Sequence, residues 1–149
     1  MNFNFIKPTI IFCAVGIFIP GFTAILFLLF QTLLAEVGIG CELYWKSTFI
    51  VMGILSIVSP LVYVKYLTNN KPTQTNLLLF NFIEYNALQI GLSQLLITPN
   101  MTCFGQSDGA MVFILTAWIA LPILVCLSFI FRKRFKSLES STTANSRHD

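Results

Sequence analysis

The sequence predicts an all-α integral membrane protein that is built as a four-helix transmembrane bundle. Of its 149 residues, 56% are hydrophobic and only 10% are charged, and the mean hydropathy is +0.79. About a quarter of the residues of a typical soluble domain are charged, so too few charges remain here for a surface that faces water. Four apolar runs supply the helices, each close to the roughly 20 residues that a membrane span needs.

The predicted spans cover residues 9–34, 49–67, 77–98 and 110–131. A cleaved signal peptide is the alternative for the first run, but such a peptide has an apolar core of only about 7 to 15 residues, so the longer run favours a retained helix. Pro20, Pro60 and Pro122 lie inside the first, second and fourth spans. Each proline removes a backbone hydrogen bond, which predicts a kink in its helix.

The spans divide the chain into one transmembrane domain, 1–136, and a short tail, 137–149. The tail reads SLESSTTANSRHD, which is polar and rich in serine and threonine and has no apolar periodicity. Such a composition cannot bury enough apolar surface to fold, so we expect a disordered cytoplasmic tail.

The distribution of basic residues predicts that both termini face the cytoplasm, because lysine and arginine accumulate in cytoplasmic loops. Lys7 precedes the first span, Lys65 and Lys71 flank or occupy the second connection, and the segment 132–136 opens the tail. The first connection has one basic residue, Lys46, and the third has none. The sequence therefore predicts a multi-pass protein of the plasma (inner) membrane, embedded in the lipid bilayer, with short outer loops.

Two of the four cysteines, Cys41 and Cys103, fall in the two predicted outer loops. Outer compartments permit disulfides, so a Cys41–Cys103 bridge is predicted, with two free thiols as the alternative. Quinone-linked disulfide oxidases of the bacterial inner membrane also combine four helices with outer cysteines, but they place a C-x-x-C pair in their first outer loop. Residues 41–44 read Cys-Glu-Leu-Tyr, and a single thiol there cannot relay electrons through such a pair.

The third span is the most polar one and contains Glu84, the only acidic residue in the four apolar runs. A carboxylate in hydrocarbon is costly and by default marks a functional site or needs a partner. At 100° per residue, one side of this helix carries Asn81, Tyr85, Gln89 and Ser93, with Asn86 beside them. Ala87 and Gly91 form a small-x-x-x-small pair on another face, which is typical of close helix contacts. We therefore expect this helix to be the most buried one.

Two interpretations of the polar residues remain open. The first is that they join helices to one another, with Glu84 in an ion pair with Lys65 from the preceding span. The second is that they line a hydrated path in which Glu84 carries a proton. The first interpretation is favoured because the spans contain no second acid that could continue a proton relay. Without Lys65, burial favours the neutral form of the Glu84 carboxyl.

These features favour a non-enzymatic accessory, assembly or immunity-type protein, whose third helix contacts a membrane protein partner or a second copy. The alternative is a small transporter or channel-like protein that uses Glu84. It resembles the small multidrug exporters in helix count and in its single membrane acid, although those proteins carry the acid in their first helix. The sequence indicates no nucleic-acid partner, because its basic residues adjoin the apolar runs, and no cofactor. It indicates no metal site either, since the one histidine, His148, lies in the tail.

Overall fold

Helices form the regular structure of the described residues, which are 3–96 and 108–145 of the computed structural model. The helices are α1 (Ile6–Phe18), α2 (Phe22–Glu36), α3 (Cys41–Asn69), α4 (Gln74–Leu96) and α5 (Asp108–Asn145). The described part of the chain is thus all-helical, as predicted, but it contains five helices where the sequence predicted four.

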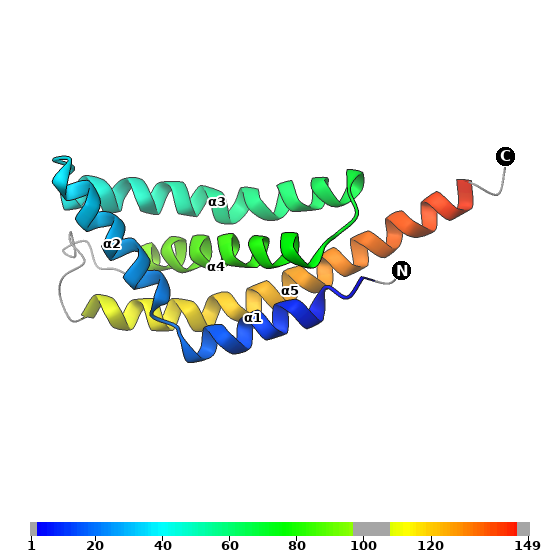
Figure 1. Cartoon of the computed structure of the whole chain (residues 1–149), viewed down its shortest axis with the longest axis horizontal. Coiled ribbons are helices and arrows are strands. Elements are labelled where there is room, and N and C mark those ends of the chain that lie inside the picture. The colour runs from blue at the N-terminus through cyan, green and yellow to red at the C-terminus, as the bar shows by residue number, and fades with distance from the viewer. Residues whose placement is uncertain (1–2, 97–107, 146–149) are drawn as a thin grey trace.

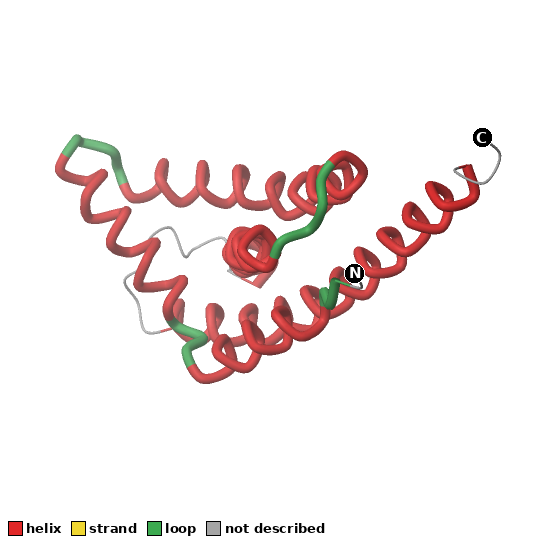
Figure 2. The backbone as a smooth tube through the Cα atoms, turned by 45° about the vertical axis from the view of Figure 1, so that its right-hand side comes forward, coloured by secondary structure: helices red, strands yellow, loops and turns green. Residues whose placement is uncertain are grey.

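α4 is the central helix of the bundle. Figure 2 shows it nearly end-on, with α3 on one side and α1 and α5 on the other. It packs against all three of these helices, while α2 packs against α3 and α5. Eleven of the 23 residues of α4 are buried, against four of the 29 residues of α3. This burial confirms the expectation that the third predicted span is the most buried one.

The first predicted span, 9–34, is not a single helix, which corrects the expectation of a kink. α1 ends at Phe18 and α2 begins at Phe22, and α2 then crosses diagonally towards the start of α3 (Figure 1). The break lies at Pro20, whose ring disfavours a helical conformation of the preceding residue. Ile19 accordingly has φ −127° and ψ 57°. By contrast, Pro60 and Pro122 lie inside α3 and α5 without ending them.

The last helix is longer than predicted. α5 continues to Asn145, so residues 137–145 are helical where we expected disorder, and no break marks the predicted boundary at 136. No proline or glycine occurs between Phe131 and Asn145. A helix that has already formed can therefore continue, since each further residue adds one backbone hydrogen bond. The end of α5 extends beyond the other helices in Figure 1.

Polar side chains lie inside the bundle and apolar side chains cover much of its outside. The buried polar residues are Thr9, Thr23, Asn81, Glu84, Asn86, Gln89, Ser93, Thr116 and Ser128. Large apolar residues are exposed on all five helices, among them Phe18 (85%), Ile57 (69%) and Met111 (71%). In the described residues, α3 (Cys41–Asn69) and the segment Met111–Ser140 of α5 are long and apolar enough to cross a membrane, while α1 and α2 are shorter apolar helices.

All the basic residues of the described part of the chain except Lys46 lie at one end of the bundle. Figure 1 places the start of α1, the connection 70–73 between α3 and α4, and the C-terminal part of α5 at this end. Lys7, Lys65, Lys71 and the basic segment 132–136 lie on these elements. The fold thus brings together the residues from which the sequence predicts a cytoplasmic side.

Candidate functional site

Glu84 is 1% exposed and faces α3 from the centre of the bundle. Its carboxylate accepts a hydrogen bond from the hydroxyl of Ser59, which lies on α3 directly before Pro60. Sequence reasoning did not single out Ser59. The spacing along the chain could have identified Ser59. A short turn at 70–73 joins α3 and α4, and Ser59 and Glu84 lie equally far from the middle of that turn, so they are at the same depth in the bundle.

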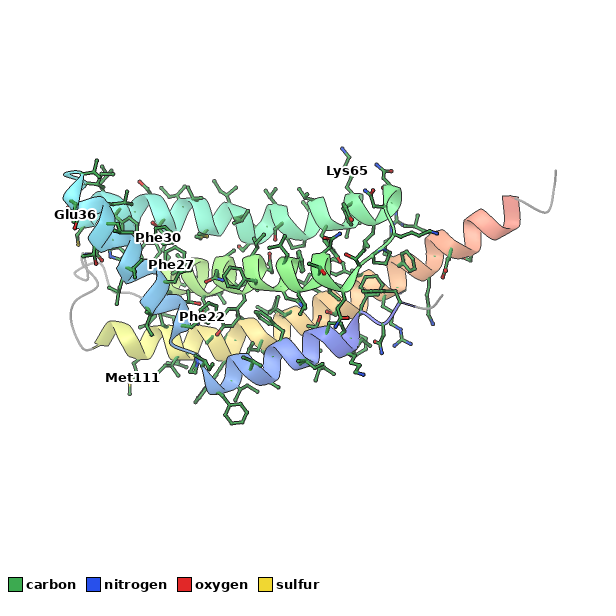
Figure 3. All side chains as sticks on the ribbon, viewed as in Figure 1. Phe22, Phe27, Phe30, Glu36, Lys65 and Met111 are labelled. Carbon is green, nitrogen blue, oxygen red and sulfur yellow. The ribbon has the colours of Figure 1, made fainter. Side chains whose placement is uncertain are left out.

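Lys65 does not pair with Glu84, which corrects the predicted ion pair. The Lys65 side chain is exposed and points away from α4 in Figure 3, and no ion pair joins it to Glu84. Lys65 lies six residues beyond Ser59 on α3, which is about 9 Å along the helix. It is thus closer to the end of the bundle than Glu84, and on the outer face of α3.

Asn81 belongs to a second buried polar contact, which joins three helices. Its Nδ2 donates a hydrogen bond to Thr9 Oγ1 on α1 (3.0 Å), and Ser128 Oγ on α5 donates to the same oxygen (2.7 Å). Thr9 Oγ1 in turn donates to the carbonyl oxygen of Phe5 (3.1 Å). The sequence indicated Asn81 but not Thr9 or Ser128. These two residues lie far from Asn81 along the chain, and no sequence pattern relates them to it.

Gln89 lies beside the break between α1 and α2. Its Nε2 donates hydrogen bonds to the carbonyl oxygens of Phe113 on α5 (2.9 Å) and of Pro20 (3.4 Å). A helix break in an apolar environment frees backbone groups that need new partners, and neighbouring helices can supply them. Gln89 therefore links the break to both α4 and α5.

Tyr85 contributes its ring to the same region. The ring stacks on Phe22 at the start of α2, with centroids 5.6 Å apart, and meets the edge of Phe12 on α1 at 5.6 Å. Its hydroxyl is buried and has no hydrogen-bond partner within the described structure. Asn81, Tyr85 and Gln89 thus share one side of α4, as predicted, and that side faces α1 and α5 and the start of α2.

The structure therefore separates the predicted site residues into three places. Asn81, Tyr85 and Gln89 face α1, α2 and α5, Glu84 faces α3, and Lys65 lies outside. Each of these buried groups makes contacts between helices, so the arrangement can hold helices together. It brings no second acid or base up to Glu84 from the described elements that pack around it.

The cysteines complete the set of predicted site residues. Cys13 and Cys126 carry free thiols, and Cys13 Sγ lies 3.6 Å from the carbonyl oxygen of Leu121. The predicted Cys41–Cys103 bridge depends on Cys103, which lies outside the described residues, so this pairing stays a prediction. Within the described ranges, no three His, Cys, Asp or Glu side chains come together as a metal site would require.

Comparison of the chain with protein-family models, with curated proteins and with solved structures gave no match.

Proposed function

We propose that this chain is a multi-pass protein of the plasma (inner) membrane, in which α1 and α2 together make the first of four passes. The buried polar residues and the exposed apolar ones support this proposal, because lipid is the solvent that favours such an arrangement. The basic end of the bundle is the cytoplasmic side, because lysine and arginine accumulate on the cytoplasmic side of membrane proteins.

Within that membrane, the protein acts as a non-enzymatic accessory, assembly or immunity-type protein that binds another membrane protein. The burial of the α4 polar side chains between helices is the observation that carries this proposal. Residues that hold the bundle together are not available to guide a substrate. They are not available as a partner surface either. The contact with a partner or a second copy is therefore made by apolar side chains that are exposed on α2 and α3, together with Phe82 of α4.

A groove between α2, α3 and α4 is the surface that best fits a partner helix. It encloses about 610 Å³ and is lined mainly by apolar side chains, including Phe27, Phe30, Leu43, Val51 and Phe82. Asn86 also lines it, and its Oδ1 has no partner in the described structure. An apolar transmembrane helix would fill this groove and cover these apolar side chains, whereas the Asn86 oxygen is enclosed within the bundle and is not reached from the groove.

Photocrosslinking in native membranes tests this function. A photoreactive phenylalanine analogue is placed at Leu43 or Val51, which are exposed in the groove, and at Phe18, which is exposed on α1 outside it. The groove positions are expected to form one discrete adduct with a membrane protein or a second copy, while Phe18 gives none. Adducts with lipid alone at the groove positions would contradict the proposal.

A small transporter that uses Glu84 is the second candidate. The observation in its favour is that Ser59, the hydrogen-bond partner of Glu84, lines another groove of about 380 Å³ between α3 and α4. Proton flux into liposomes that contain a pH-sensitive dye separates the two candidates. For a binding protein, wild type and Glu84→Gln are expected to give the same background flux. A flux that Glu84→Gln abolishes in correctly folded protein would favour transport.

A further inference from the structure

A cavity with three basic side chains lies at the basic end of the bundle, where α1 begins beside α5. It has a volume of about 590 Å³. Lys7 comes from the first turn of α1, while Arg132 and Lys136 come from α5. No acidic residue is among the described residues that line it. The cavity therefore concentrates positive charge from two helices that are far apart in the sequence.

The local structure favours an anion in this cavity. Arg132 and Lys136 are one helical turn apart, and like charges at this spacing repel each other. The start of α1 adds the positive end of its helix dipole. Asn4 fixes this start, because its Oδ1 accepts hydrogen bonds from the backbone N–H groups of Ile6 (3.1 Å) and Lys7 (3.3 Å). An anion would offset the repulsion and gain charge-assisted hydrogen bonds.

Apart from Asn4, the other side chains that line the cavity are apolar, which limits the kind of anion that fits. Ile10 and Ile11 line it on the side towards the middle of α1, and they are 52% and 51% exposed. A soluble anion would leave these side chains uncovered, whereas an acyl chain below a phosphate group would cover them. Basic pockets between helices on the cytoplasmic side are places where anionic lipid headgroups bind.

We propose that this cavity binds the phosphate headgroup of an anionic phospholipid, with Lys7, Arg132 and Lys136 as its ligands. The site rests on the proposed location in a membrane, but not on the groove or on any protein partner. The lipid would hold the start of α1 against α5 at the cytoplasmic face.

Two double variants with the same change of charge test the site. Arg132→Gln with Lys136→Gln removes two cations of the cavity, while Lys133→Gln with Arg134→Gln removes one lysine and one arginine of the same helix that do not line it. Native mass spectrometry then measures how much phosphatidylglycerol or phosphatidylcholine each purified protein retains. All four residues are exposed, so both variants are expected to fold, which circular dichroism checks.

Wild type is expected to retain phosphatidylglycerol over phosphatidylcholine. The cavity variant is expected to bind phosphatidylglycerol about tenfold more weakly than the control variant, since two direct ligands are lost. Lys7→Gln, on the other helix, is expected to weaken binding as well. Equal losses in the two double variants would attribute the affinity to net charge and overturn the proposal.

Competition separates a lipid from a soluble phosphate compound. Glycerol phosphate and inorganic phosphate are expected not to displace phosphatidylglycerol at equal concentration, because they lack the acyl chains that Ile10 and Ile11 contact. Displacement by either one would assign the cavity to a soluble anion and overturn the lipid site. Neither outcome changes the crosslinks expected in the groove, so failure here is distinct from failure of the proposed function.

Discussion

Gly91→Ala is expected to destabilise the bundle by about 1 to 3 kcal/mol, while Gly53→Ala leaves its stability unchanged or slightly increased. A Cβ atom on Gly91 would lie 3.3 Å from the Cα and 3.6 Å from the N of Gly53. These are backbone atoms of α3, which cannot rotate away, so the two helices would have to move apart by a few tenths of an ångström. A Cβ atom on Gly53 would meet no other atom within 4 Å.

The two glycine variants control for each other, because both change a helical glycine to alanine and gain the same helix propensity. Unfolding in a titration with sodium dodecyl sulphate, followed by circular dichroism, gives the free energy of unfolding of each purified variant. Gly91→Leu is expected to lower it further than Gly91→Ala, since the larger side chain enters the same contact. If Gly53→Ala and Gly91→Ala are equally stable, the close approach of α3 to α4 is absent.

Much of the α3–α4 packing could be predicted from the sequence. The polar turn 70–73 joins two antiparallel helices, so residues at equal distances from its middle lie at the same depth. Three contacts follow this rule, with midpoints at residues 71–72: the Ser59–Glu84 hydrogen bond, the Tyr63–Phe80 ring stack and the close approach of Gly53 to Gly91. The sequence predicted a close helix contact at Gly91, and the equal-distance rule would have identified Gly53 as the residue that it contacts.

The same rule explains why the Lys65–Glu84 prediction was wrong. Lys65 is level with Leu78, which lies six residues before Glu84 on α4, or about 9 Å along the axis. A long lysine side chain could cover part of that distance, but it would have to leave the outer face of α3. Its charge is better solvated at the end of the bundle, towards which lysines extend.

The contacts of α1 and α2 could not be predicted in this way. Thr9 and Ser128 are 72 and 47 residues from Asn81 in the sequence, and no short turn relates their helices to α4. The effect of Pro20 was equally undetermined, because a proline can lie inside a continuous helix, as Pro60 does, or end it. Whether a helix ends at a proline depends on whether a neighbouring helix can donate a hydrogen bond to a backbone carbonyl that the break frees. At Pro20, the side-chain amide of Gln89 donates to the Pro20 carbonyl oxygen.

Glu84→Ala is expected to lower the free energy of unfolding by about 2 to 4 kcal/mol. The side chain is fully enclosed, so its loss leaves a cavity, and the Ser59 hydroxyl loses its acceptor. Glu84→Gln is expected to stay close to wild type, because the amide oxygen of glutamine can accept the same hydrogen bond. Detergent unfolding of the two variants measures the difference.

Two further variants decide whether Glu84 acts through Ser59 alone. Ser59→Ala is expected to cost about 1 kcal/mol, and its effect should disappear when Glu84 is already alanine, because the two groups share one hydrogen bond. Lys65→Ala is expected to be neutral, since that side chain is exposed. Additive effects of Ser59→Ala and Glu84→Ala, or a loss of stability in Lys65→Ala similar to that in Glu84→Ala, would mean that the carboxyl has a different partner in the membrane.

A binding protein needs Glu84 for its fold, so its partner crosslinks should follow the stability of these variants and survive in Glu84→Gln. A transporter would instead lose its activity in Glu84→Gln although the bundle remains intact.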